Sequence, residues 1–422
     1  MKETVTTILL WMMGMSLFAQ DSITLTDCHR LARENAPRLD DSRAIEQMGA
    51  LKVRQASVNW YPGLELSGRA TYQSDVIEIA LSDPMIPVEF PQMPKDQYGI
   101  NLDISQTIYD GGMVSRRKSV EEASTRAGMQ QVEVDLYLLK GQVNQLYFTL
   151  LLLQEQRKNL EVHLENLLTR RKVVETAVES GTVLEGDLKL VDVEILRIKK
   201  SLAELDATRR AGLDALMILC GKGDNRAFQL TDPGLKAPSG QENTRPEWLL
   251  FELRDASLEA RRELAGRQRM PLVYAFGQAG YGKPGYNMLS EEWDFYYRVG
   301  AGVRWQIWDW KETSREQQII RRQQEMLRNR ERTFGLEMES RRAREEARME
   351  QIRESIQLEK ELLELQEGIT EQSAVNLAHG TMTVAEYLTE LSKENLSRIR
   401  LGTHRIELQQ SIANYLLIQG NL

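Results

Sequence analysis

The chain has 422 residues, of which 41% are hydrophobic and 27% are charged, and this is the ordinary balance of a folded protein with one large or two smaller domains. The formal net charge is −8, which argues against nucleic acid as a partner because such a partner favours a basic face. Neither value excludes a membrane protein, because a membrane-spanning strand hides its apolar character in alternation.

Residues 1–20 are predicted to be a secretory signal peptide. Lys2 gives a weak positive start, residues 8–18 are mostly apolar, and small residues follow near a plausible cleavage point. The apolar stretch is too short for a helix that spans the bilayer. No later segment of the sequence has the roughly 18 consecutive apolar residues that a spanning helix needs. An ordinary buried N-terminal helix is the alternative interpretation.

Cys28 and Cys220 are the only two cysteines of the sequence. Export would permit a disulfide, but two cysteines far apart in sequence do not make a disulfide framework. We therefore expect two unpaired, buried thiols. Neither cysteine directly follows the signal core, so the usual lipid-anchored cysteine is missing.

Four segments alternate between apolar and polar residues, as expected of strands with two unlike faces. In the first half these are residues 64–72 and 98–108, and in the second half they are residues 273–281 and 299–307. The apolar face is predicted to carry Leu64, Leu66, Ala70, Ile100, Leu102, Ile104, Val273, Ala275, Val299 and Val303. The aromatic residues near the strand ends would form an interfacial girdle of Tyr61, Tyr72, Tyr98, Tyr109, Trp308 and Trp310.

Each alternating segment has roughly the 9–11 residues with which a tilted strand crosses a bilayer. A half-buried strand of a soluble sandwich would alternate in the same way. Four strands cannot close a barrel, and open edges in lipid would leave backbone groups unpaired. A membrane position would therefore require several copies of the chain.

Two helical hairpins of unusual length are predicted to follow the strand pairs. Residues 113–232 contain no proline, and apolar residues recur at steps of three and four between Met129 and Leu153. This heptad pattern is typical of a left-handed coiled coil. A helix over residues 113–180 would be about 100 Å long, far longer than a globular helix.

Glycine is predicted to reverse the chain at the tip of each hairpin. The first hairpin, 113–221, would turn at Gly181-Thr182, and the second, 312–420, would turn at Gly380-Thr381. The middle of the second hairpin, residues 341–350, is nearly all charged. We interpret these residues as a solvent-exposed helix face. The hairpin has too few apolar residues here to pack by itself, so it would need neighbouring helices, and this requirement favours an oligomer.

An internal repeat organises the whole chain. Residues of the first half recur in the second half at an offset of 209 before the strand loop and of 199 after it. The matched pairs include Pro37 and Pro246, Pro62 and Pro271, Tyr72 and Tyr281, Ile108 and Ile307, Asp110 and Asp309, and Gly181 and Gly380. The difference in length falls in a predicted loop that contains Pro84, Pro87, Pro91 and Pro94.

The repeat predicts the division of the chain. A signal peptide (1–20) would precede a first repeat (21–221), a connector (222–243) and a second repeat (244–420). Each repeat would contain a helix, a strand pair and a long helical hairpin, with the strand pairs at about 62–110 and about 271–309.

This organisation resembles that of the TolC-type outer-membrane efflux proteins, the outer membrane factors of tripartite export systems. The matching local features are the strand exit Gln106-Thr107-Ile108-Tyr109-Asp110-Gly111-Gly112 and the two Gly-Thr tips. The segment 380–388, Gly-Thr-Met-Thr-Val-Ala-Glu-Tyr-Leu, is similar to the family's tip signature, in which an acidic residue follows Gly-Thr. The resemblance covers nearly the whole mature chain.

The resemblance implies a mainly α-helical protomer with a β-barrel part. Three copies would form a 12-stranded barrel in the outer membrane and a helical tunnel in the periplasm. The tunnel would dock onto a periplasmic adaptor, or membrane fusion protein, and an inner-membrane pump. The protein would then be a passive export conduit that needs no cofactor and binds no nucleic acid, and the exported substrate is not written in the sequence.

The resemblance also implies a gate at the hairpin tips. In the family, acidic residues just after each tip line a closed entrance, and Asp187 and Glu386 occupy the matching positions. Threefold symmetry would bring their copies together in an acidic ring that favours cations. The alternative is that both are ordinary first-turn carboxylates stabilised by the helix dipole. The predicted entrance comprises Asp187, Glu386, Gly181, Thr182, Gly380, Thr381 and Met382, of which Met382 replaces the family's basic partner.

We expect no enzymatic activity and no metal site. His29, His163, His379 and His404 are not spaced from one another, or from a cysteine or acid, as metal ligands on one helix face would be. The sequence also lacks a phosphate-binding glycine loop and a nucleophile elbow. The arginine-rich stretch 315–348 is interleaved with glutamate, which is typical of a salt-bridged helix. The alternatives to a channel are a secreted structural coiled-coil protein and, more weakly, an autonomous porin.

Overall fold

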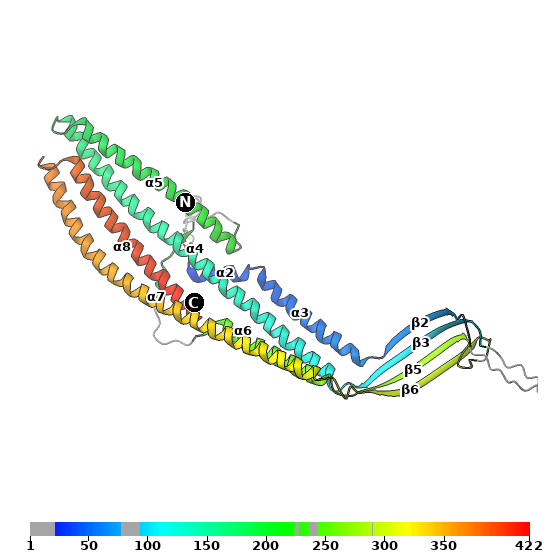
Figure 1. Ribbon diagram of the computed structural model, residues 1–422. Coiled ribbons are helices and arrows are strands. Elements are labelled where there is room, and N and C mark those ends of the chain that lie inside the picture. Colours follow the sequence, from blue (N-terminus) through cyan, green and yellow to red (C-terminus); the bar gives the residue numbers. More distant parts are fainter. Residues whose placement is uncertain (1–21, 77–92, 224–227, 237–242, 289) are drawn as a thin grey trace, which may run out of the picture. The chain divides into compact units, whose positions relative to one another are not determined.

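The computed structural model describes residues 22–76, 93–223, 228–236, 243–288 and 290–422 (Figure 1). The predicted signal peptide and the loop prolines 84, 87 and 91 lie outside the described residues. The chain divides into two compact units, and both halves of the sequence contribute to each. Among the described residues, the helical unit comprises those within 22–41, 132–248 and 333–422, and the strand unit comprises those within 42–131 and 249–332.

Helices make up most of the described chain. Those of the first half are α2 (Leu25–Glu34), α3 (Arg38–Ser57), the 3-10 helix η1 (Val58–Trp60), α4 (Met113–Glu179) and α5 (Glu185–Leu219). Those of the second half are α6 (Pro246–Arg267), α7 (Glu312–Ala378) and α8 (Val384–Gln419). Over the described residues, no helix combines the length and the apolar character needed to cross a membrane.

One antiparallel sheet dominates the strand unit. Its strands, in spatial order, are β2 (Gly63–Tyr72), β3 (Asp96–Tyr109), β5 (Leu272–Lys283) and β6 (Asp294–Arg304). Because β3 pairs with β5, the sheet joins the two halves of the sequence, and β2 and β6 form its edges. The prediction of only four strands was wrong, since β1 (Ser22–Ile23) and β4 (Gln229–Leu230) form a short parallel pair in the helical unit.

The last strand of the sheet begins and ends earlier in the sequence than its alternation predicted. The apolar pattern continues to Ile307, whereas β6 ends at Arg304. Arg304 pairs with Leu272, the first residue of β5, so the residues that follow have no strand beside them. The indole N–H of Trp305 instead donates a hydrogen bond to the backbone oxygen of Arg269, at 3.1 Å. Alternation alone therefore could not locate the end of the strand.

The same turn leads from strand to helix in both halves. Asp110 and Asp309 each accept hydrogen bonds from the backbone N–H groups two and four residues further on, at 2.6–3.1 Å. The two residues after each aspartate have φ between 49° and 85°. Gly111-Gly112 adopts this left-handed conformation easily, while Trp310-Lys311 adopts it against the preference of residues with a Cβ. The two halves thus share the backbone geometry of this turn, although Gly111-Gly112 in the first half corresponds to Trp310-Lys311 in the second.

The sheet has two unlike faces. Leu66 and Leu102, which pair across β2 and β3 on the predicted apolar face, are 72% and 46% exposed. On the opposite face, the Gln278 amide donates to the Asp103 carboxylate at 2.7 Å, and the Tyr296 hydroxyl donates to the side-chain oxygen of Asn101 at 2.6 Å. The polar face therefore satisfies much of its own hydrogen bonding, and the apolar face is left uncovered in the single chain.

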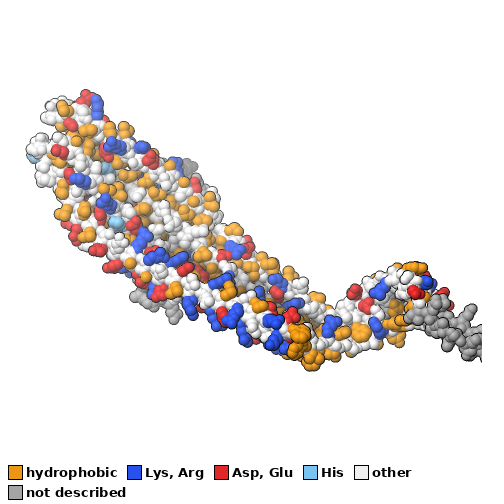
Figure 2. All heavy atoms as spheres, in the orientation of Figure 1, with side chains coloured by type: hydrophobic (Ala, Val, Ile, Leu, Met, Phe, Trp, Pro, Cys, Tyr) orange, Lys and Arg blue, Asp and Glu red, His pale blue; other side chains and the backbone are white. Residues whose placement is uncertain are grey.

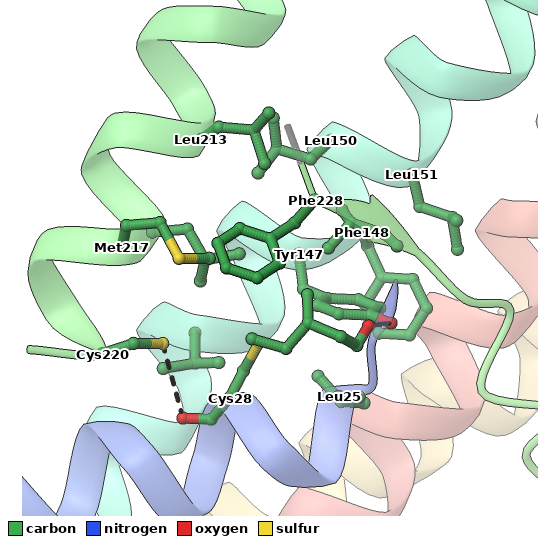
Figure 3. Close-up of a cluster of buried hydrophobic side chains, with 14 of the residues drawn as sticks. Leu25, Cys28, Tyr147, Phe148, Leu150, Leu151, Leu213, Met217, Cys220 and Phe228 are labelled. Atoms are coloured by element: carbon green, nitrogen blue, oxygen red, sulfur yellow. Dashed lines mark hydrogen bonds between the residues drawn. The ribbon is translucent and has the colours of Figure 1, made fainter. Parts of the chain in front are cut away.

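The main core of the helical unit lies where α2, α4 and α5 meet β4 and the segment before α2 (Figure 3). Tyr147 is fully buried there, with its hydroxyl 3.1 Å from the Ile23 carbonyl oxygen and 2.7 Å from that of Thr231. The predicted heptad positions Val143 and Leu150 are buried as expected. The buried face of α4 is wider than one heptad seam, because the helix packs on several neighbours at once.

A buried histidine lies beside this core. The His29 side chain is 9% exposed, and its Nε2 lies 2.7 Å from the Asn144 side-chain oxygen, on a residue that is itself 1% exposed. Burial lowers the pKa of His29 to about 4, against an ordinary value of 6.5, although the Asn144 hydrogen bond acts in the opposite direction. The folded protein therefore holds this imidazole neutral.

We expect the helical unit to lose stability as the pH falls from 6.5 towards 4. Over this interval the unfolded chain protonates His29 and the folded chain does not, so the stabilisation is complete above pH 6.5 and disappears near pH 4. The loss should be on the order of 3 kcal/mol. Denaturant unfolding at several pH values measures it, and His29→Gln should flatten this part of the profile. A variant that follows the wild-type profile would contradict the assignment.

Candidate functional site at the hairpin tips

Glycine reverses the chain at both tips. Gly181 and Gly380 have φ values of 75° and 70°, a conformation that glycine adopts without steric cost. The threonine after each glycine donates both its backbone N–H and its hydroxyl to the carbonyl oxygen five residues earlier, at 2.9–3.0 Å. These bonds satisfy carbonyl groups that the ends of α4 and α7 leave unpaired. The Gly-Thr pairs are therefore required by the turn itself.

The helices that leave the two tips begin differently. Thr383 and Glu386 form a capping box at the start of α8, in which the Glu386 carboxylate accepts from the Thr383 N–H at 2.9 Å and from its hydroxyl at 2.8 Å. These hydrogen bonds lower the pKa of Glu386, so its side chain is charged at neutral pH. At the equivalent place before α5, Leu184 provides no side-chain cap and is 77% exposed.

The structure brings the predicted tip residues into one region without placing them in one polar site. Asp187 lies half-buried in the first turn of α5, and its backbone N–H donates to Leu184 at 3.0 Å. Glu386 is exposed and engaged by its own helix cap, as the alternative interpretation expected of a first-turn carboxylate. Met382 packs against the apolar side chains of the tips.

Both hairpins contribute to one buried group of side chains near the tips, which we term the tip cluster. α4 and α5 supply Leu167, Val174, Val191, Ile195 and Ile198, and α8 supplies Val384, Tyr387 and Leu391. Because the side chains are shared, separating the hairpin ends would expose apolar surface. The two tips run side by side in the helical unit in Figure 1.

The polar contacts near the tips were not predicted from the sequence. The Arg170 guanidinium lies 5.3 Å from the ring centroid of Tyr387, whose side chain is 3% exposed. Burial raises the pKa of Tyr387, which keeps its hydroxyl protonated. Arg171 pairs with Asp192 across the first hairpin at 2.6 Å. The step from Val384 to Tyr387 to Leu391 has helical periodicity and would have indicated that Tyr387 faces inward.

Within the described residues, no three His, Cys, Asp or Glu side chains are grouped so that they could hold a metal ion. The arginine-rich α7 carries ion pairs between Arg322 and Glu325 and between Arg342 and Glu346. Figure 2 shows basic and acidic side chains mixed along this helix. The surface of α7 thus carries paired charges of both signs.

The chain matches one known family by sequence and several solved structures by fold. Residues 29–222 match the sequence model of the family described as outer membrane efflux protein. No curated protein matches the chain. The resemblance to the TolC-type efflux family that the sequence indicated is therefore confirmed over residues 29–222. The fold of solved outer-membrane channels is shared over nearly the whole chain.

Solved outer-membrane channels share this fold. The outer membrane protein VceC of Vibrio cholerae is 13% identical, with a TM-score of 0.67 over 94% of this chain and 96% of that chain. CusC, described as forming a transmembrane channel, is 16% identical, with a TM-score of 0.71 over 96% of this chain and 95% of that chain. The MtrE outer membrane channel of Neisseria gonorrhoeae, in an open state, is 13% identical, with a TM-score of 0.68 over 94% and 88%.

Proposed function

We propose that the protein is the outer-membrane channel of a tripartite efflux or secretion system. Three copies would close a 12-stranded barrel in the outer membrane, and their helices would form a periplasmic tunnel. A periplasmic adaptor and an inner-membrane pump would deliver the cargo, and the channel itself would perform no chemistry. The family match over residues 29–222 and the fold shared with solved outer-membrane channels support this proposal.

The observation that carries the proposal is the sheet. Its apolar face exposes Leu66, Ile100 and Val299 at 72%, 58% and 76%, a pattern that suits contact with lipid. Its edges β2 and β6 each have one side without a partner strand among the described residues. Unpaired edges are costly in lipid, and pairing β6 of one copy with β2 of the next would remove them.

The division of the chain follows from this proposal. A signal peptide over residues 1–20 would direct export, and the repeats 21–221 and 244–420, joined by the connector 222–243, would each supply two strands and one hairpin. The strands would lie in the membrane, and the hairpins would extend into the periplasm. The two hairpins of each chain would then occupy nearly equivalent positions in the wall of the tunnel.

The native mass of the mature protein, extracted from membranes in mild detergent, tests the proposal. A trimer found only in the detergent extract is the expected result, because the proposed barrel has twelve strands and each chain supplies four. A monomer or dimer in the soluble fraction would contradict it. Such a result would favour the secreted structural coiled-coil protein instead.

The tips would form the gate of this channel, with the acidic side chains of Asp187 and Glu386 at its narrow end. We expect the double variant Asp187→Asn, Glu386→Gln to raise conductance in planar bilayers and to weaken the preference for cations. Carboxylates that hold a cation at a constriction slow its passage, and the neutral amides would hold it less tightly. An unchanged current would count against an acidic gate.

A matched variant separates charge from helix capping. Glutamine can keep the capping box that Glu386 forms, so the double variant removes charge and preserves most of the cap. Thr383→Ala does the reverse, since it removes the hydroxyl cap at a cost of about 1 kcal/mol and leaves both carboxylates. If Thr383→Ala alone raised the conductance equally, loosening of α8 would explain the effect and the charges would not.

A further inference from the structure

Two cysteines that are far apart in sequence meet inside the main core of the helical unit. Cys28 lies in α2, and Cys220 is the residue at the C-terminal end of α5. Both side chains are fully buried and stand as free thiols in this structure. The Cys220 thiol donates a hydrogen bond to the backbone oxygen of Cys28, with sulfur and oxygen 3.7 Å apart (Figure 3).

The backbone on either side of the two cysteines is held in place independently of the thiols. The Asn35 side chain, at the end of α2, donates to the carbonyl oxygen of Cys220 at 3.0 Å and to that of Leu31 at 2.9 Å. Gly221 has a φ of 68°, and a Cβ added there would lie 2.3 Å from the Asn35 side chain. The end of α2 and the end of α5 therefore meet closely.

The thiols also influence each other. A hydrogen bond with Cys220, followed by burial, raises the pKa of Cys28, while the same contact lowers the pKa of Cys220. The side chains around them are apolar or hydrogen-bonded elsewhere, among them Phe148 and Tyr147. The core offers the pair no metal and no third ligand, since the described residues hold no group of three His, Cys, Asp or Glu that could bind one.

We propose that Cys28 and Cys220 form a disulfide when the protein folds in an oxidising compartment. The inference rests on the proposed function, because export to the periplasm is what supplies that compartment. A structural disulfide would fasten α2 to the end of α5 across 192 residues of sequence. It would join the start of the mature chain to the return helix of the first hairpin.

The oxidant is a disulfide-bearing protein or small molecule. The Cys220 thiolate attacks one sulfur of that disulfide and displaces the other as a thiolate. The Cys28 thiolate then attacks the Cys220 sulfur of the mixed disulfide, so the sulfur–sulfur bond of the protein forms as the second oxidant thiolate leaves. The protein gives up two electrons and two protons, and the oxidant is reduced to a dithiol. The exchange precedes closure of the core, because both thiols are buried afterwards.

The test is the number of reactive thiols in the full-length protein. Protein purified from membranes in detergent is quenched with acid, denatured without reductant, alkylated and weighed by mass spectrometry. We expect no alkyl group without reductant and two after reduction. Cys28→Ser should show one under both conditions. Reductant should also lower the thermal midpoint of the wild type by several degrees, about 5–10 °C, and leave that of Cys28→Ser unchanged.

A second sample tests the disulfide independently of the proposed channel function. Denatured, reduced protein is refolded in detergent with a glutathione redox buffer, which needs neither export nor a membrane. Loss of both reactive thiols there supports the pairing even if the protein is absent from the membrane fraction of the cell. Two alkyl groups on the refolded protein would overturn the disulfide, whatever the native mass shows about the channel.

Discussion

Leu66→Arg should abolish recovery of the trimer from membranes. Leu66 lies in the middle of β2, is 72% exposed and pairs with Leu102 on the apolar face of the sheet. An arginine on the lipid side of a barrel strand costs about 2–4 kcal/mol at the bilayer midplane, and a trimer would contain three of them. The ratio of trimer in the detergent extract to total protein measures the effect.

Ser67→Arg is the matched control for this experiment. Ser67 is the next residue of β2, is half-buried and pairs with Asn101 on the polar face. Successive side chains point to opposite faces, so the same substitution one residue later places its charge away from lipid. We expect near wild-type recovery of the trimer. Equal loss in both variants would mean that neither face of the sheet contacts lipid.

Periodicity carried most of the fold prediction. Strict alternation located the four sheet strands, and the long heptad pattern with its Gly-Thr tips located the two hairpins, because these signals follow directly from strand and helix geometry. The short β1 and β4 could not be predicted, since two residues have no period. The end of β6 depends on where β5 begins, and pairing partners of this kind are not visible in one segment.

The candidate gate was harder to predict than the fold. The positions of Asp187 and Glu386 came from the family resemblance. The contact between Thr383 and Glu386 was not predicted, although their spacing of three residues is the pattern of a capping box. The contact between Arg170 and Tyr387 joins residues more than two hundred positions apart, so only the packing of two hairpins creates it. A ring of charges would exist only between copies of the chain, and it remains a prediction.

Tyr147→Ala should have the largest effect on the stability of the helical unit. The Tyr147 side chain is fully buried, and its hydroxyl joins α4 to the carbonyl oxygens of Ile23 and Thr231, next to β1 and β4. Truncation leaves a cavity the size of a ring, for which about 3–5 kcal/mol is expected. Tyr147→Phe keeps the ring and removes only the hydroxyl group that donates to these carbonyl oxygens, which should cost about 1–3 kcal/mol. Denaturant unfolding in detergent measures both, and equal losses would mean that the hydroxyl, rather than packing, holds this core together.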